Sequence, residues 1–204
     1  MLNLTLTHGP RLSVVMEPSG CAVIGNRISR EKPRGEPVSL SAYRAQPRLE
    51  LRLLHTLALD KSQQFLTTTK NSYKLSHARD SCPIVTYDYT RNPPNSYPEA
   101  HFHLHGEAVA IREMLDRCGR TKDKPDDLHF PVGGRRFRPC LEDLIEFCIL
   151  EQLVLPHDGW QKALEESRRR FHKRQLQAAV RGDPEVAADA LVKAGWRVTA
   201  AGAE

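Results

Sequence analysis

The sequence predicts an α+β protein in which an antiparallel β-meander packs against helices from the C-terminal part of the chain. Two observations carry this prediction. Apolar and polar residues alternate along 49–59 and again along 101–105, which is the period of a half-buried strand. From residue 107 onward the apolar spacing is that of an amphipathic helix. The chain has 204 residues, of which 40% are hydrophobic, so it is long enough to bury one full core.

The N-terminal part is expected to contain short strands and then a loop. Alternation at Leu2, Leu4 and Leu6, followed by turn signals, predicts two or three short strands within residues 1–28. Residues 29–47 are polar and rich in proline, which favours a loop. The chain is therefore divided into N-terminal strands at 1–28, a polar loop at 29–47, a core meander with helices and the histidine strand at 48–157, and a basic helical extension at 158–204.

Strand-forming residues continue from residue 49 to the histidine-rich segment. An alternating leucine run spans 49–59, and β-branched and aromatic residues recur at 65–69, 73–75 and 84–89. Together with the histidine strand, these segments predict a meander of four or five strands. The loop at 91–98 contains three prolines, so it is expected to be stiff and to shape any pocket beside the histidine strand.

Helical periodicity dominates the rest of the chain. The first helix is expected at 107–118, because Gly119 stands where a helix would end. The other helices are expected at 141–154, at 160–180, and from the Asp183-Pro184 cap to about Gly195.

Between the first two helices, residues 128–138 predict a β-hairpin. The Gly-Gly pair at 133–134 suits a two-residue turn, since glycine accepts positive φ at both central positions. In this register His129 faces Arg138, and alternation puts Arg136 on the same face as both. The sequence therefore predicts two guanidinium groups beside an imidazole.

The segment His-Phe-His-Leu-His-Gly-Glu at 101–107 is the main candidate for a functional site. On a strand, His101, His103 and His105 point to one face while the two apolar residues between them point to the other. The segment therefore predicts a row of three imidazoles on one sheet surface, with the apolar pair anchoring the strand in the core. The alternative is an ordinary polar strand face.

A divalent metal, zinc or manganese, is one candidate ligand of this row. The outer histidines lie ~13 Å apart by strand rise, so all three cannot share one ion through bonds of about 2 Å. We expect His103 and one neighbour, such as His105, to bind the ion together with a residue from elsewhere. The candidates for that residue are Asp88, Glu107, His129 and His77.

A metal-free site is the second candidate. His101, His103, His105 and His129 offer groups for general acid and base catalysis, and Arg136 and Arg138 offer paired donors to a phosphate. This constellation suits cleavage of RNA phosphodiester bonds. The alternative for the two arginines is a solvated hairpin or a clamp on Glu142 and Glu146.

The charge of the chain favours an acidic partner. The formal net charge is +5 and the sequence pI is near 9.0. One basic cluster spans 168–174, and it is expected either to contact nucleic-acid phosphates, with RNA ahead of DNA, or to be a solvated helix face. Its cations are Arg168, Arg169, Arg170, Lys173 and Arg174.

Composition and motifs exclude several classes of protein. The five cysteines are scattered, without a Cys-x-x-Cys pair, which argues against a disulfide framework and a thiolate zinc site. The chain has no phosphate-binding P-loop, dinucleotide-binding glycine motif, Gly-x-Ser-x-Gly elbow or His-Glu-x-x-His helix. It also has no apolar run long enough for a membrane span and no export signal, so we expect a cytoplasmic protein without membrane contact.

Three segments, at 87–93, 98–107 and 131–139, resemble an uncharacterised bacterial protein family, to which no activity is assigned. They read Tyr-Asp-Tyr-Thr-Arg-Asn-Pro, Pro-Glu-Ala-His-Phe-His-Leu-His-Gly-Glu and Pro-Val-Gly-Gly-Arg-Arg-Phe-Arg-Pro. In layout, residues 49–155 are similar to toxin components of bacterial toxin–antitoxin modules. That resemblance implies a ribonuclease-like toxin with an antitoxin as its protein partner, although the N-terminal strands and C-terminal helices depart from it.

Two function hypotheses follow from the sequence. The first is a hydrolase that cleaves phosphodiester bonds with a histidine site, with or without a divalent metal. The second is a non-catalytic module that binds nucleic acid or an acidic protein through its basic C-terminal helices.

Overall fold

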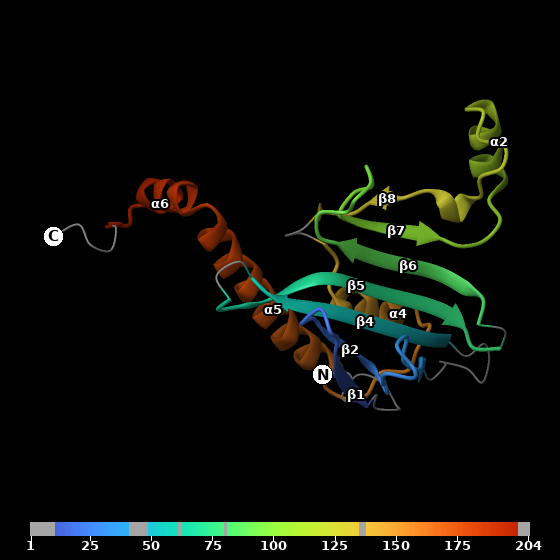
Figure 1. Ribbon diagram of the computed structural model, residues 1–204, viewed down its shortest axis with the longest axis horizontal. Helices are drawn as coiled ribbons and strands as arrows, with labels where there is room; N and C mark the ends of the chain where they lie inside the picture. Colours follow the sequence, from blue (N-terminus) through green and yellow to red (C-terminus); the bar gives the residue numbers. More distant parts are fainter. Residues whose placement is uncertain (1–10, 41–48, 61–62, 80, 135–137, 200–204) are drawn as a thin grey trace.

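The computed structural model describes residues 11–40, 49–60, 63–79, 81–134 and 138–199. These form an α+β fold around one eight-stranded sheet with the strand order β1-β2-β4-β5-β6-β7-β8, and β3 pairs with β4 beside β2 (Figure 1). Every pair of neighbours is antiparallel, which confirms the expected meander. The strands are β1 (Leu12–Met16), β2 (Ala22–Asn26), β3 (Val38–Leu40), β4 (Leu49–Leu59), β5 (Leu66–His77), β6 (Pro83–Thr90), β7 (Ala100–Leu104) and β8 (Phe130–Pro131).

One described helix and a short 3₁₀ turn lie between β7 and β8 in the chain, and three described helices follow β8. They are α2 (Val109–Arg117), the turn η1 (Pro125–Asp127), α4 (Leu141–Leu150), α5 (Trp160–Gly182) and α6 (Pro184–Lys193). No helix among the described residues is long and apolar enough to cross a membrane.

The sheet has two distinct faces because its strands alternate. One face carries Leu51, Leu53, Tyr73 and Leu75, which form the buried core together with α4 and the start of α5. We call it the covered face. The other face carries the side chains between these positions, such as Ser72, which pairs with Asp88 on β6. No described helix lies over this open face, which is turned toward the viewer in Figure 1.

Helix α4 supplies most of the helical side of the core. Leu144, Ile145 and Ile149 recur at helical spacing and are buried against the covered face. The helix begins where the Asp143 carboxylate accepts a hydrogen bond from the Cys140 N–H at 2.8 Å. Burying one such side chain stabilises the fold by about 2 kcal/mol, so α4 and the leucines of β4 anchor the sheet.

Helices α5 and α6 differ in how much they pack. Leu164 of α5 is 1% exposed and belongs to the core. Helix α6 begins at Asp183, whose carboxylate accepts a hydrogen bond from the Val186 N–H, but it has no buried residue. In Figure 1 the C-terminal part of α5 leads away from the sheet and carries α6 with it.

Two expectations for single segments need correction, and a third concerns residues that are not described. The expected loop at 29–47 contains strand β3, because Val38 and Leu40 alternate with Ser39 and are buried against β4. The expected strands at 65–69 and 73–75 are one strand, β5, with a bulge opposite Thr56 and Leu57 that accommodates an irregular register. The expected strand at Leu2–Leu6 lies outside the described residues.

The expected hairpin at 128–138 is also different. Strand β8 pairs with β7, and Phe130 stacks on Phe102 with ring centroids 5.0 Å apart. Arg138 lies on the covered face, with its guanidinium 4.2 Å from the ring centroid of Tyr89, so it does not face His129. The pairing with β7 buries apolar surface that a free hairpin would expose. The second hairpin strand, including Arg136, lies outside the described residues.

Candidate metal centre

Strand β7 brings two histidines to the open face. His101 and His103 pair with Asp88 and Thr86 of β6, while Phe102 between them points to the covered face and packs on the core. The alternation of the sequence therefore places the imidazoles as expected. His101 is 8% exposed and His103 is half-buried, so both rings are largely removed from water.

A third imidazole joins them from a distant part of the chain. His129 lies between η1 and β8, and the pairing of β8 with β7 carries it to the edge of the sheet. One nitrogen from each of His101, His103 and His129 lies within 4.8 Å of the other two. We call these three residues the histidine cluster. It is the group among the described residues in which side chains of metal-ligand type converge in this way.

The tautomers of two cluster members are determined by backbone carbonyls. Nδ1 of His101 donates a hydrogen bond to the Pro98 carbonyl at 2.8 Å, and Nδ1 of His103 donates to the Asp126 carbonyl at 2.7 Å. A carbonyl only accepts, so each Nδ1 carries the proton and each neutral ring keeps its Nε2 lone pair. Metal-binding histidines typically have this second hydrogen bond, which orients the ring.

The proline-rich loop at 91–98 holds the cluster from the side. It provides the Pro98 carbonyl that receives His101, and Tyr97 stacks on His129 with ring centroids 3.6 Å apart. The interplanar angle of 19° leaves His129 little freedom to rotate. The stiff loop therefore acts on the site in the way that its composition indicated.

His105 has different partners, although it follows the same alternation. Its Nε2 lies 2.9 Å from the Thr86 hydroxyl, and its Nδ1 lies 3.7 Å from the Asp126 carboxylate. Burial lowers the pKa of His105, and Lys74 lowers it further, while Asp126 opposes the shift. The chain therefore does not bring His105 into the histidine cluster, because the strand rise separates it from His101.

The two acidic candidates, Asp88 and Glu107, lie in different surroundings. Oδ2 of Asp88 lies 3.9 Å from Nε2 of His103, so the carboxylate borders the cluster without belonging to its tight group. Glu107 is exposed in the turn that follows β7, after Gly106 with φ of 133°. Of the expected ligands His103, His105, Asp88 and Glu107, the histidine cluster contains His103, and Asp88 lies beside it. The other two members of the cluster are His101 and His129.

The surroundings of His129 favour its neutral form. Burial lowers the pKa of His129, and the neighbouring His103 and His101 lower it further. A neutral imidazole is the form that binds a metal ion.

The donor set and its geometry fit a transition metal such as zinc. Zn–N bonds of about 2.0–2.1 Å place tetrahedral ligands about 3.3 Å apart. The nitrogens here lie within 4.8 Å, so small side-chain rotations would bring them to that spacing. Three histidines leave a fourth position open, which is the pattern of catalytic rather than structural zinc sites. Manganese prefers more oxygen donors than this cluster provides.

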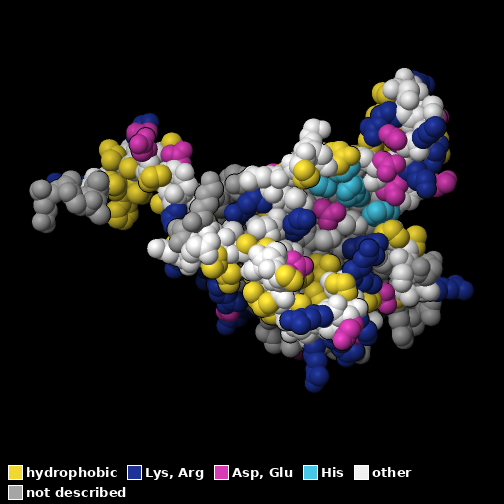
Figure 2. Space-filling model, viewed as in Figure 1, with side chains coloured by type: hydrophobic (Ala, Val, Ile, Leu, Met, Phe, Trp, Pro, Cys, Tyr) yellow, Lys and Arg dark blue, Asp and Glu magenta, His cyan; other side chains and the backbone are white. Residues whose placement is uncertain are grey.

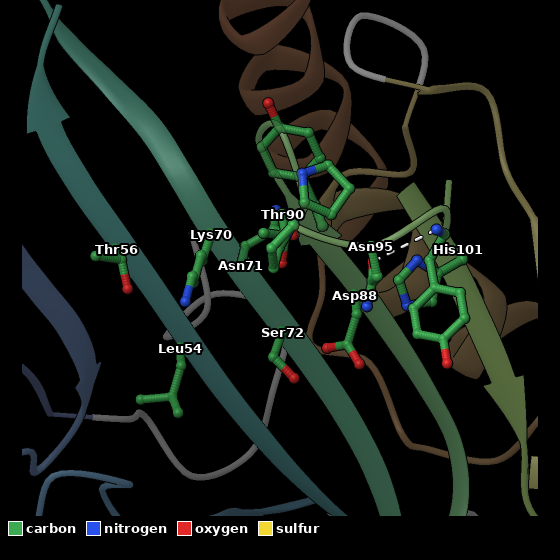
Figure 3. A pocket seen from close by; sticks show the side chains of 13 residues that line it. Leu54, Thr56, Lys70, Asn71, Ser72, Asp88, Thr90, Asn95 and His101 are labelled. Carbon is green, nitrogen blue, oxygen red and sulfur yellow. Dashed lines mark hydrogen bonds between the residues drawn. The ribbon is translucent and has the colours of Figure 1, made fainter. Parts of the chain in front are cut away.

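A cavity of about 450 Å³ adjoins the cluster on the open face. It is large enough for a small organic ligand or one unit of a polymer. His101 and Asp88 form one wall, the proline loop forms another, and β4 and β5 form the floor (Figure 3). The lining residues beyond these are Leu54, Thr56, Lys70, Asn71, Ser72, Tyr89, Thr90, Pro93, Pro94, Asn95 and Tyr97.

The expected arginine and lysine contacts lie elsewhere. Arg138 is on the covered face, beneath Tyr89 and near Phe171. On α5, which packs against the same face, Arg168 is paired with Asp143 at 2.9 Å and with Glu146 at 2.6 Å. Arg169 pairs with Glu165, at 3.5 Å. Arg170, Lys173 and Arg174 are exposed on α5. The sheet therefore separates the basic helix from the histidine cluster.

Sequence reasoning missed several groups around the cluster. The Asp126 carbonyl and the Thr86 hydroxyl have no sequence signal, since both depend on which segments become neighbours. Tyr97 could have been found, because it lies in the loop whose prolines indicated a pocket wall. Lys70 could also have been found, as a cation that alternation places on the same face as the histidines.

Comparisons with known proteins add no identity to this geometry. No protein family model, no curated protein and no solved structure matches the chain.

Proposed function

We propose that the protein is a metal-dependent hydrolase that cleaves phosphodiester bonds on the open face of its sheet. The observation that carries the proposal is the histidine cluster, whose ring nitrogens converge within 4.8 Å. The hydrogen bonds from Nδ1 of His101 and His103 to backbone carbonyls support it, because they orient two rings of the cluster and leave each Nε2 outside those bonds.

The proposed chemistry is the hydrolysis of a phosphate ester. His101, His103 and His129 would hold the ion, zinc in the first place and manganese second, and the ion would supply activation of a water near neutral pH. In the hydrolysis a water adds to phosphorus as the bond to the leaving oxygen breaks. One proton of the water reaches the leaving oxygen, so the products are a phosphomonoester and an alcohol.

Asp88 is the proposed proton acceptor of that reaction. Its carboxylate borders both the cluster and the cavity, at 3.9 Å from His103. It is therefore next to the position where a metal-bound water would lie, and it can pass the proton to the leaving oxygen.

The choice of a phosphate ester rests on charge. A net charge of +5 favours an anionic substrate, and Lys70 lines the cavity that adjoins the cluster. RNA is the polymer we put first, DNA second. A ribonuclease-like toxin role, with an antitoxin as partner and the cytoplasm as location, belongs to the same proposal and is supported by the resemblance of layout alone.

The first test is a metal measurement on untagged protein after exhaustive dialysis without chelator. Wild type is compared with His103→Ala and with His172→Ala, a matched control on the exposed surface of α5. We expect near-stoichiometric zinc or manganese in wild type and in the control, and none in His103→Ala. Absence of metal from all three proteins, before and after incubation with either ion, would reject the metal centre.

The second test is cleavage of a fluorescent single-stranded RNA. We expect cleavage by the metal-loaded wild type, loss with a chelator, recovery when the ion returns, and loss in Asp88→Asn with the metal retained. Full activity in the metal-free protein would instead support catalysis by His and Lys groups without an ion.

A non-catalytic binding module is the second candidate function. The observation that favours it is the exposed cationic surface formed by Arg170, Lys173 and Arg174 of α5, the helix whose start packs on the covered face. If replacing these three residues abolishes nucleic-acid binding while His103→Ala leaves it intact and no substrate is cleaved, this candidate replaces the hydrolase.

A further inference from the structure

The open face carries cations that neither the histidine cluster nor α5 explains. Lys70 and Lys74 lie on β5 and point to the same side of the sheet as Ser72 between them. Ser72 pairs with Asp88, which pairs in turn with His101. The two lysines therefore bracket the row of side chains that leads across the sheet to the cluster.

The spacing of the lysines follows from strand geometry. Four residues along a strand place their Cα atoms ~13 Å apart, with the Ser72 row midway between them. Two strand spacings of about 4.8 Å separate β5 from β7. An extended polyanion lying along β5 would thus contact both ammonium groups. Its segment between these two contacts would lie on the same face as the histidine cluster.

Both ammonium groups are available for such a contact. Within the described part of the chain, the ion pairs of 4.0 Å or less involve neither Lys70 nor Lys74. Lys70 is exposed and lines the cavity, and Lys74 is close enough to His105 to lower its pKa. A third cation, Arg52 of β4, lies opposite Lys74 of β5 in the strand register.

The figures show the same arrangement. In Figure 3, Lys70, Ser72 and Asp88 project from neighbouring strands into one open space. In Figure 2, which shows the open face, Lys and Arg side chains lie beside the histidine group rather than apart from it.

We propose that the open face binds a single strand of nucleic acid along β5, with Lys70 and Lys74 on phosphates to either side of the one presented to the histidine cluster. This inference rests on the proposed function and names its substrate more closely. A single strand is favoured because the cavity between the proline loop and β4, of about 450 Å³, has room for one unit of a polymer. Contacts from lysine to phosphates would add affinity without base readout. Tyr97 also lines the cavity and is 46% exposed, so part of an aromatic side chain is accessible beside the proposed path.

The test is a binding measurement that does not depend on catalysis. The probe is a fluorescein-labelled, twelve-nucleotide single-stranded RNA, with DNA of the same sequence as a second probe, and the protein is full-length and kept metal-free with chelator. Lys70→Ala/Lys74→Ala is compared with wild type by fluorescence anisotropy over a series of salt concentrations. The matched control is Lys162→Ala/Lys173→Ala, which removes the same charge from exposed positions of α5.

The expected result is a weaker affinity of the open-face variant and a smaller salt dependence. Each lost phosphate contact lowers the slope of log K against log salt by about 0.7 for a single strand, so the slope should fall by about 1.4. The α5 variant should keep the wild-type slope to within about 0.3. The single variants Lys70→Gln and Lys74→Gln should each give about half of the effect, and thermal unfolding confirms that all variants are folded.

The possible outcomes separate this inference from the proposed function. If only the α5 variant lowers the slope of log K against log salt, or if wild type binds neither probe, the proposed binding path along β5 is wrong. If the open-face variant binds like wild type while the metal-loaded protein cleaves RNA, the hydrolase stands and the path fails. If binding depends on the lysines while no metal binds and no cleavage occurs, the path stands and the hydrolase fails.

Discussion

The two faces of the sheet are made by the same strands but hold different kinds of side chain. On the covered face, leucines and tyrosines are buried against α4 and α5. On the open face, the alternate residues are His101, His103, Asp88 and the two lysines, and their partners are loops and backbone carbonyls. One face therefore carries the apolar core, and the other carries the histidine cluster.

Polar groups have different surroundings on the two faces. On the covered face they are held neutral or stacked: burial lowers the pKa of His55 to about 4, burial raises the pKa of Tyr73, and Arg138 lies against Tyr89. On the open face three imidazoles each bring one nitrogen to within 4.8 Å of the others, and His101 also lines a cavity. The two faces therefore differ in that the covered face isolates its polar groups among packed side chains, whereas the open face brings groups of metal-ligand type together.

The largest expected effect tests whether the covered face carries the stability. Leu164→Ala removes a side chain that is 1% exposed between α5 and the core. The lost burial and the cavity left behind should cost about 2–5 kcal/mol of unfolding free energy, measured by urea denaturation. Zinc binding by the folded variant should remain stoichiometric. A cost below about 0.5 kcal/mol, the level of an ordinary surface substitution, would show that α5 is not part of the stabilising core.

The second effect is a pH dependence from His55 on the covered face. Burial is the main cause that lowers its pKa from 6.5 to about 4, and Arg138 adds to it. The unfolded chain takes up this proton near pH 6.5 and the folded chain only near pH 4, so stability is complete above 6.5. It falls as the pH drops through this window, by up to about 3 kcal/mol.

The measurement for His55 is urea denaturation at pH 7.5 and at pH 4.0. In His55→Phe, the difference between the two values should shrink by up to about 3 kcal/mol relative to wild type. His172→Ala serves as the control, because that histidine is exposed on α5. An unchanged pH dependence in His55→Phe would mean that His55 is already solvated in the folded protein.

The third effect concerns the open face. If the histidine cluster binds zinc, free zinc at about 100 times its Kd should raise the unfolding free energy by about 2.7 kcal/mol, because the ion binds the folded state. His103→Ala should lose this gain while keeping its metal-free stability to within about 1 kcal/mol. Equal stabilisation of wild type and His103→Ala would place the ion at other residues.

Much of the fold follows from local pattern, and the site follows only in part. The alternation along β4 and β7 and the helical period of α4 predict these elements, since each depends on its own residues. The pairing of β8 with β7 was not predictable in this way, because it joins segments about 30 residues apart that carry no local signal for each other.

The site shows the same division. The sequence predicts that His101 and His103 share a face, and that a residue from elsewhere completes a metal site with two members of the row. It does not select His129 among the candidates, and it favours His105 over His101 as the neighbour. That choice depends on Pro98 and Asp126, whose carbonyls lie beside His101 and His103 only after the chain has folded.

The smallest expected effect separates two arginines that are adjacent in the sequence and lie on the same helix. Arg168 bonds to Asp143 and Glu146 of the sheet-covering region, and its side chain is 22% exposed. Arg169 contacts Glu165 of its own helix and is 72% exposed. Arg168→Ala should cost about 1–2 kcal/mol, since it removes charge-assisted hydrogen bonds between α4 and α5. Arg169→Ala should cost less than about 0.5 kcal/mol.

Urea denaturation of the two variants in low and in high salt measures this difference. The cost of Arg168→Ala should shrink in high salt only in part, because its partners are half-buried, and neither variant should change zinc binding or the salt slope for single-stranded RNA. If Arg168→Ala weakens RNA binding without loss of stability, the basic helix takes part in recognition. The covered side of the molecule would then contribute to RNA binding as well as to stability.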